Sequence, residues 1–346
     1  MSLPDSISFG NTLSLDNIAL TCNETTPKAN PPGIFQTGTV IANKYIIHDE
    51  IGQGKFGIVY KGEHFKHKTP VAIKTEPVSS EYNTIKYETT ILNYLFSSGC
   101  RSIPAVLWYG IYNNYKCLTM DYYDQTIAQY LLSARSKYSV GSLDYLLQIM
   151  KLITNMVAIV GQIHKHQIIH RDIKPENFML KDGNLYLIDF GIASAVDNLE
   201  DINKDPTRET VIGSPKYISY FIHQGYEPMY RDDLISIGYC FFYFVMGKLP
   251  WDNSNNTSTI ENHTSIYPEI HILHEKNQLR KKWKSWITIE KLLEKLIGKH
   301  VSLSLDNTSK CEKIFENMFE YFSLCYNLQL EERPFYDELC KVLQNK

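Results

Sequence analysis

The chain has 346 residues and a formal net charge of −3, so it can bury a large core in one two-lobed unit or in two domains. This small charge excludes a basic nucleic-acid-binding or membrane-binding composition, and the longest apolar stretch, residues 239–246, is far shorter than the roughly 20 residues that span a bilayer. The seven cysteines contain no C-x-x-C pair, which indicates free thiols in a reducing compartment, so we expect an intracellular protein of the cytoplasm or nucleus.

Composition divides the chain into an extension and a larger folded unit. Residues 1–44 are predicted to form a flexible extension, because Ser, Thr, Asn and Pro dominate most of this segment. Residues 45–120 show strand patterns around one helix, and residues 124–343 are mainly helical beyond a short connection. We therefore expect an α+β fold with a β-rich N-lobe (45–120), a helical C-lobe (124–343) and a cleft between them.

The first motif in chain order is rich in glycine. It consists of Gly52, Gln53, Gly54, Lys55, Phe56, Gly57, Ile58 and Val59. Glycines at this spacing allow backbone N–H groups to approach phosphate oxygens closely, because a Cβ atom would block that approach. Taken alone, the pattern fits a plain β-hairpin better, so its interpretation depends on the motifs that follow.

Lys74 follows three apolar residues, which is a poor environment for an unpaired ammonium group. Apolar residues recur at helical spacing in residues 81–96, and Glu88 lies on the same stripe. Because a carboxylate on a buried helix face needs a cation, we predict an ion pair between Lys74 and Glu88. The alternatives are a lysine that reaches solvent, and a Glu88 that pairs with Lys86 or lies at an exposed helix edge.

The most informative motif is His-Arg-Asp-Ile-Lys-Pro-Glu-Asn at residues 170–177. In such a loop the catalytic Asp172 can orient an acceptor hydroxyl, while Asn177, five residues later, holds Mg²⁺. Lys174 carries a charge that can reach a transferred phosphate. Asp189 follows a predicted short buried strand in an Asp-Phe-Gly motif, and it would add a second hard oxygen ligand for Mg²⁺.

These motifs occur in the order found in protein kinases, and the chain resembles that family over residues 45–343. The resemblance implies that ATP and Mg²⁺ bind between the lobes and that the γ-phosphate passes to a protein hydroxyl. Lys74, paired with Glu88, would contact the α- and β-phosphates. The implied adenine pocket consists of Ile51, Val59, Ala72 and Met179, with the backbone of Asp121 and Tyr123 at its edge.

Later segments resemble the casein kinase I family, with the vaccinia-related kinases as near relatives. The segments are Gly-Ser-Pro-Lys-Tyr-Ile-Ser at 213–219, in place of the usual Ala-Pro-Glu, Arg-Asp-Asp-Leu at 231–234 and Leu-Pro-Trp at 249–251. The intact His-Arg-Asp and Asp-Phe-Gly motifs favour casein kinase I over those relatives. By this resemblance Asp233 anchors the catalytic loop, and Ser214 forms hydrogen bonds near Asp172 and Lys174.

The same resemblance implies Ser/Thr acceptors, at sites that family members often select for acidity. Lys216 occupies the position of one basic residue that would contact such a site. A second basic residue, expected just after Leu-Pro-Trp, is replaced by Asp252, which leaves a preference for primed substrates open. Arg333 also lacks the glutamate partner that this arginine has in most kinases.

Three classes of function remain to be compared. An active Ser/Thr kinase is favoured because every residue that the chemistry needs is present, whereas a pseudokinase scaffold would have lost at least one. A small-molecule kinase would keep these residues, but it would not be expected to keep the activation segment and the Leu-Pro-Trp region. We therefore expect a monomeric kinase that uses ATP and Mg²⁺, acts on protein substrates, and binds neither nucleic acid nor membrane.

Overall fold

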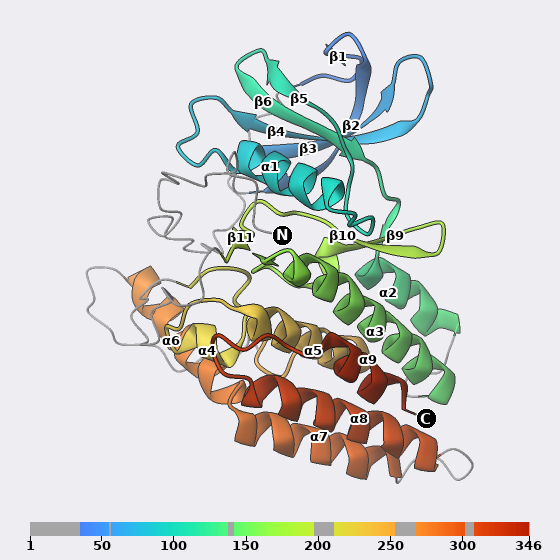
Figure 1. The fold of residues 1–346 in the computed structure, drawn as a ribbon, viewed down its shortest axis with the longest axis vertical. Helices are drawn as coiled ribbons and strands as arrows, with labels where there is room; N and C mark the ends of the chain where they lie inside the picture. The colour runs from blue at the N-terminus through green and yellow to red at the C-terminus, as the bar shows by residue number, and fades with distance from the viewer. Residues whose placement is uncertain are drawn as a thin grey trace.

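The computed structural model describes residues 35–54, 57–137, 142–196, 211–252, 268–301 and 308–345. These residues form two lobes of different composition (Figure 1). The smaller lobe is a β-sheet with one helix, and the larger lobe is mainly helical. The predicted α+β fold of two lobes is therefore confirmed.

The N-lobe contains a six-stranded antiparallel sheet with the strand order β1-β2-β3-β4-β6-β5. The strands are β1 (Val40–Ile41), β2 (Tyr45–Gly54), β3 (Gly57–His64), β4 (Pro70–Pro77), β5 (Val106–Tyr112) and β6 (Tyr115–Asp121). Alternate side chains of the central strands, among them Ile47, Tyr60 and Ile73, form a small core on one face. The helix α1 (Thr84–Ser97) contacts β4, β5 and β6.

Part of the predicted extension packs onto this sheet. Phe35 is buried, and its ring centroid lies 5.4–5.9 Å from those of Tyr60, Tyr112 and Tyr115. Its backbone N–H also donates to the Tyr60 hydroxyl (3.2 Å), and β1 pairs with β2. Residues 35–44 thus belong to the packed N-lobe, in contrast to the expectation from composition, because aromatic contacts and strand pairing offset their polar sequence. Residues 1–34 lie outside the described part of the chain.

The N-terminus of α1 is held by a carboxylate from β4. Asn83 precedes the helix in a left-handed conformation (φ 47°) and makes no side-chain cap. Instead, Oε2 of Glu76 accepts hydrogen bonds from the hydroxyl of Thr84 and the backbone N–H of Ile85, both at 2.9 Å. Oε1 of Glu76 lies 3.3 Å from Nζ of the buried Lys116. Because Glu76 and Lys74 share β4, this strand is attached to α1 at two points.

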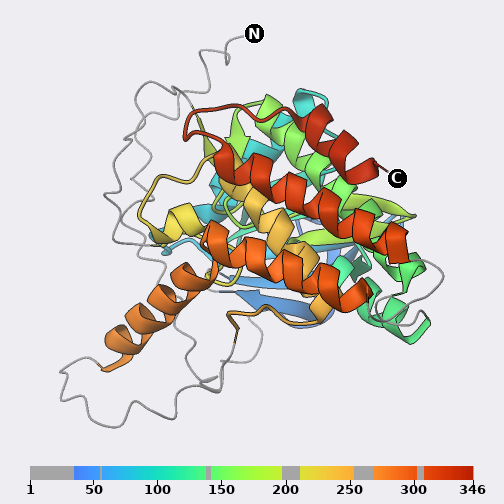
Figure 2. The same cartoon turned by 90° about the horizontal axis from the view of Figure 1, so that it is seen from below.

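The C-lobe packs around one central helix. Its elements are β7 (Gln125–Thr126), α2 (Ile127–Lys137), α3 (Leu143–Lys165), β8 (Ile168–Ile169), η2 (Pro175–Asn177), β9 (Phe178–Lys181), β10 (Asn184–Leu187), β11 (Ser194–Ala195), α4 (Tyr220–His223), α5 (Tyr230–Met246), α6 (Pro268–Trp283), α7 (Trp286–Val301), α8 (Thr308–Asn327) and α9 (Tyr336–Gln344). The short strands β9 and β10 lie where the two lobes meet (Figure 1). Figure 2 shows α6 extending outward from the helical lobe.

The central helix α3 is the long amphipathic helix expected before the catalytic loop. It contacts α5, α8 and α9, and most of its apolar side chains are buried. By length and composition α3 would pass as a membrane span, but its apolar face is occupied by these neighbouring helices. Residues 239–246 lie in α5 and are largely buried, so their interpretation as a core helix is confirmed.

Replacing Glu76 by alanine should lower the free energy of unfolding by about 3–5 kcal/mol, because the Lys116 ammonium would stay buried without its partner. Glu63→Ala is the matched control, since Glu63 also pairs with a lysine, Lys68 (2.6 Å), but at the surface, where such pairs contribute little. Urea denaturation measures both variants. Similar stability in the two variants would contradict the proposed role of Glu76.

Candidate active site

Lys74 lies between two carboxylates from distant parts of the chain. Its Nζ atom is 2.7 Å from Oε2 of Glu88 on α1 and 2.7 Å from Oδ1 of Asp189, which follows β10. Oε1 of Glu88 also accepts a hydrogen bond from the backbone N–H of Phe190 (3.1 Å). The predicted Lys74–Glu88 ion pair is therefore present, and the alternative of a Lys86 partner is wrong. Strand β4, helix α1 and the Asp-Phe-Gly segment meet at one ammonium group.

The protonation states in this cluster follow from burial and mutual attraction. Burial alone would lower the pKa of Lys74, but the carboxylates of Asp189 and Glu88 raise it, so the ammonium stays charged. The Lys74 charge lowers the pKa of Asp189 to about 2, whereas burial raises the pKa of Glu88. The side chain of Glu88 is 1% exposed and that of Asp189 is 43% exposed. Asp189 is thus the ionised carboxylate that a ligand can reach.

The backbone of the catalytic loop is held by the carboxylate of Asp233 on α5. The carboxylate accepts hydrogen bonds from the backbone N–H groups of His170 (2.8 Å) and Arg171 (3.0 Å), and it also contacts Nε2 of His164 (2.9 Å). Although burial opposes ionisation, these hydrogen bonds lower the pKa of Asp233. Arg171 has a φ of +66°, which is costly for a residue with a side chain. The predicted anchoring role of Asp233 is confirmed, and the anchor stabilises a strained turn.

Asp172 lies in a hydrogen-bond network of four residues. Its Oδ2 atom is 2.6 Å from Nζ of Lys174 and 3.1 Å from Nδ2 of Asn177. Its Oδ1 atom accepts from the hydroxyl (2.6 Å) and the backbone N–H (3.1 Å) of Ser214. Burial would lower the pKa of Lys174, but the adjacent Asp172 raises it. The predicted contacts of Ser214 are confirmed. The network also places the Asp172 carboxylate next to the ammonium group of Lys174, which stays charged.

His170 links this loop to the strand that leads to Asp189. Its Nε2 atom lies 3.0 Å from the carbonyl oxygen of Ile188, and its Nδ1 atom lies 3.3 Å from the backbone N–H of Asp172. A carbonyl only accepts and an amide only donates, so Nε2 carries the proton and Nδ1 is the acceptor. Burial lowers the pKa of His170, which agrees with a neutral ring in this single tautomer.

The two residues expected to hold Mg²⁺ offer oxygen atoms only. The Asn177 amide group donates to the carbonyl oxygen of Asp172 (2.8 Å), an orientation that reserves Oδ1 for another partner. Among the described residues, no cluster of His, Cys, Asp or Glu could hold a metal by itself. Mg²⁺ commonly takes one or two protein oxygens and completes its shell with phosphates and water. The donors Asn177 and Asp189 therefore fit an Mg²⁺ ion that binds together with a nucleotide.

The described part of the glycine-rich segment consists of the end of β2 and the start of β3. A Cβ atom on Gly57 would lie 1.6 Å from the backbone oxygen of Thr75, so only glycine fits there. A Cβ atom on Gly52 would meet nothing within 4 Å, so this position borders open space. Residues 55 and 56, between these strands in the sequence, are outside the described residues. The segment thus combines one crowded glycine with one that leaves room for a ligand.

Two residues of the expected adenine pocket share a sheet face with Lys74. Lys74 is directly opposite Val59 in the β3–β4 register, and Ala72 precedes it by two, so all three share one face. The side chain of Ile58, the residue before Val59, points instead into the N-lobe core, so the predicted contact of Ile58 with a cofactor stays a prediction for its backbone. Ile51 is 48% exposed. Met179 is half-buried on β9.

The connection between the lobes is fixed by two side chains. Oδ2 of Asp121 accepts a hydrogen bond from the backbone N–H of Ala105 (3.1 Å). The buried ring of Tyr123 packs on that of Tyr186 on β10, with centroids 4.6 Å apart. These contacts hold the backbone at 121–123 next to β10, where the sequence analysis places the adenine edge.

The chain matches the family model of the protein kinase domain over residues 45–321. This match covers most of the chain and every site residue described above. The chain therefore belongs to the protein kinase family. Its enzyme class is accordingly that of a transferase that acts on proteins.

The buried contacts of four residues were not predicted from the sequence: His164, Tyr336, Glu76 and Lys284. The first two form a buried chain in which Nδ1 of His164 contacts the Tyr336 hydroxyl and Nε2 contacts Asp233. A histidine on the apolar stripe of α3 was the available signal. No local pattern could have paired it with a tyrosine that lies 172 positions later.

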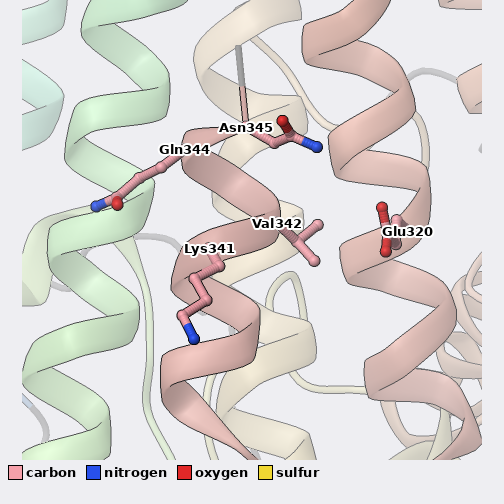
Figure 3. A pocket seen from close by; sticks show the side chains of 5 residues that line it. All are labelled: Glu320, Lys341, Val342, Gln344 and Asn345. Atoms are coloured by element: carbon pink, nitrogen blue, oxygen red, sulfur yellow. The ribbon is translucent and has the colours of Figure 1, made fainter.

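A separate hollow lies at the C-terminal end of α9, far along the C-lobe from this site. Figure 3 shows its lining residues, of which Glu320 comes from α8 and the others from α9 or the residue after it. They are Glu320, Lys341, Val342, Gln344 and Asn345. None of them contacts the network around Asp172, so this hollow is not part of the candidate active site.

Asp233→Asn should release the catalytic loop, because an amide has only one oxygen to accept the two backbone hydrogen bonds. Hydrogen exchange should become faster at the amides of His170 and Arg171. Asp232→Asn is the matched control, since Asp232 is equally buried but accepts from the Met229 backbone (2.7 Å). It should lower the overall stability without selective exchange in the loop. Equal protection of the loop in wild type and Asp233→Asn would contradict the anchor.

Proposed function

We propose that the chain is an ATP- and Mg²⁺-dependent Ser/Thr protein kinase similar to casein kinase I, which transfers the γ-phosphate of ATP to protein hydroxyls. The observation that carries this proposal is the network in which Asp172 contacts Lys174 and Ser214. It coexists with the Lys74 contacts to Glu88 and Asp189. The two sets of contacts that the proposed transfer needs support this function because they occur together.

Each residue of the site has a distinct part in this proposal. Bound Mg²⁺–ATP would supply the transferable phosphate and the neutralisation of its charge. Lys74 would hold the phosphates, and Asp189 and Asn177 would hold the metal. Asp172 would orient the acceptor hydroxyl and take up its proton. Lys174, 2.6 Å from Asp172, would offer its charge to the transferred group.

The two competing functions meet specific objections. A pseudokinase scaffold would lack part of the Lys74–Glu88–Asp189 cluster or the Asp172 network, and both are complete in this chain. A small-molecule kinase would have no use for an ordered surface after Ser214. Here the carbonyl oxygen of Lys216 is fixed by a hydrogen bond from Trp251 Nε1 (2.7 Å). These observations support a protein acceptor.

Acceptor selection depends on Lys216 in this proposal. Nζ of Lys216 lies 2.8 Å from Oδ2 of Asp252, and both side chains are partly exposed. Asp252 occupies the place of the second basic residue found in the family, so it competes with an acidic substrate for the same ammonium. We therefore propose a weak preference for acidic sites rather than a strict requirement.

We propose the cellular location, oligomeric state and partners of the enzyme from its sequence alone. The cysteine pattern favours a reducing compartment, so we place the kinase in the cytoplasm or nucleus. We propose a monomer that acts on protein substrates and has no nucleic-acid or membrane partner.

Asp172→Asn should lower the rate of phosphate transfer by about 10²–10⁴-fold, because it removes the group that takes up the hydroxyl proton. ATP affinity should stay close to that of wild type, since other residues hold the nucleotide. Labelled phosphate incorporation and calorimetric ATP titration measure the two quantities. Asp182→Asn, at an exposed turn, is the control. A wild-type rate in Asp172→Asn would refute the assignment of this loop.

Asp189→Ala should abolish Mg²⁺-dependent transfer, because the phosphates would lose their main counter-ion clamp. Asn177→Ala should reduce transfer less completely, since one of two ions can still bind. The Mg²⁺ dependence of ATP affinity gives a readout that is separate from turnover. Undiminished turnover in Asp189→Ala, or full activity in excess chelator, would exclude this metal site.

Lys216→Ala should raise KM for acidic peptides by roughly two- to fivefold, the range of exposed ion pairs, and leave KM for neutral peptides unchanged. Asp252→Asn should have the opposite effect, because it frees the ammonium. Added salt should weaken the wild-type preference, since exposed charges are screened over about 8–10 Å. Equal changes on acidic and neutral peptides would show that these residues do not select acceptors.

A further inference from the structure

Lys284 is a fully buried lysine that the proposed transfer chemistry does not use. It lies in the turn between α6 and α7, at the end of α6 that joins the C-lobe (Figure 2). Its Nζ atom donates to the backbone carbonyls of Pro215 (2.8 Å) and Ile218 (2.6 Å), and it lies 3.2 Å from Nε2 of His223. No carboxylate among the described residues contacts it.

The amino group of Lys284 has polar partners without a carboxylate, although burial and the nearby Arg280 lower its pKa well below the usual value. Two of its N–H groups donate to the backbone carbonyls, and the His223 nitrogen is its third hydrogen-bond partner. The ring centroids of Tyr239 and Trp251 lie 5.2 and 5.3 Å from Nζ, within the range of cation–π attraction. The side chain is therefore fully satisfied, which explains how it tolerates complete burial.

The carbonyls that Lys284 holds belong to the segment that follows the Asp172 network. Ser214 contacts Asp172 at one end of this segment, and Trp251 holds the carbonyl of Lys216 in its middle. Gly213, just before it, packs so closely on the catalytic loop that a Cβ atom would lie 2.3 Å from the Arg171 oxygen. Lys284 thus completes a set of contacts that fix residues 214–218 relative to Asp172.

Most kinases stabilise this region with a glutamate–arginine pair, and the glutamate is missing here. Arg333, the expected arginine, instead lies with its guanidinium carbon 5.9 Å from the Tyr230 ring. We propose that Lys284 is a positioning residue that fixes residues 214–218 through their backbone carbonyls, so that a protein hydroxyl meets Asp172 in register. This inference rests on the proposed kinase function. It requires no contact between Lys284 and either substrate.

The test compares Lys284→Met and Lys284→Gln with Lys282→Met, a change at an exposed lysine two residues earlier. In Lys284→Met, KM for a Ser/Thr peptide should rise roughly tenfold or more, since small misplacements can cost up to about 10²-fold. KM for ATP and the slow hydrolysis of ATP by water should stay within about twofold of wild type, because neither needs residues 214–218. Lys284→Gln, which can still donate to one carbonyl, should give intermediate values.

Hydrogen exchange provides a readout that does not depend on activity. The backbone amides of Tyr217 and Ile218 donate to the carbonyl oxygen of Ser214. Their exchange rates should rise in Lys284→Met and should equal those of wild type in Lys282→Met. Unchanged exchange and an unchanged peptide KM would overturn the inference. A parallel loss of peptide transfer, ATP affinity and overall stability would overturn it too, because that pattern indicates general destabilisation. A wild-type protein that transfers no phosphate would refute the proposed function, whereas the exchange result would still decide the role of Lys284.

Discussion

The architecture of the site depends on one shared ammonium group. Lys74 contacts Glu88 and Asp189 at the same distance of 2.7 Å, so β4, α1 and the segment after β10 are positioned by a single charge. Removing any partner would leave an uncompensated charge, which is costly at the buried Glu88. The second attachment of α1, through Glu76, lies on the same strand. Helix α1 is thus fixed to β4 at two points.

In the C-lobe, charged side chains likewise hold the backbone of the catalytic loop. Two residues with side chains, Arg171 and Asp189, have left-handed φ values of +66° and +65°, and such strain persists only where surrounding contacts impose it. Asp233 holds the first through backbone amides, and Lys74 holds the second through its side chain. Charged side chains thus stabilise both strained backbone conformations in this region.

The sequence predicted those features that depend on local patterns. The α+β lobes followed from periodicity and the Lys74–Glu88 pair from the burial of charge, whereas the Asp233 anchor was implied by the resemblance to the casein kinase I family. Features that depend on distant pairing could not be predicted, and Lys284 is the clearest example, because its partners are backbone carbonyls that carry no sequence signal. Phe35 was assigned to the extension for a similar reason: a single aromatic residue in a polar segment does not reveal the rings on which it packs.

The most direct test of the account is the identity of the phosphorylated residue. Purified protein should be incubated with labelled ATP, Mg²⁺ and an acidic protein mixture, and the product should be hydrolysed for phosphoamino acid analysis. The proposed assignments of Asp172, Lys174 and Asp189 predict phosphoserine and phosphothreonine, and no transfer when Mg²⁺ is chelated. Phosphotyrosine as the main product, or ATP turnover without phosphorylated protein, would contradict the account.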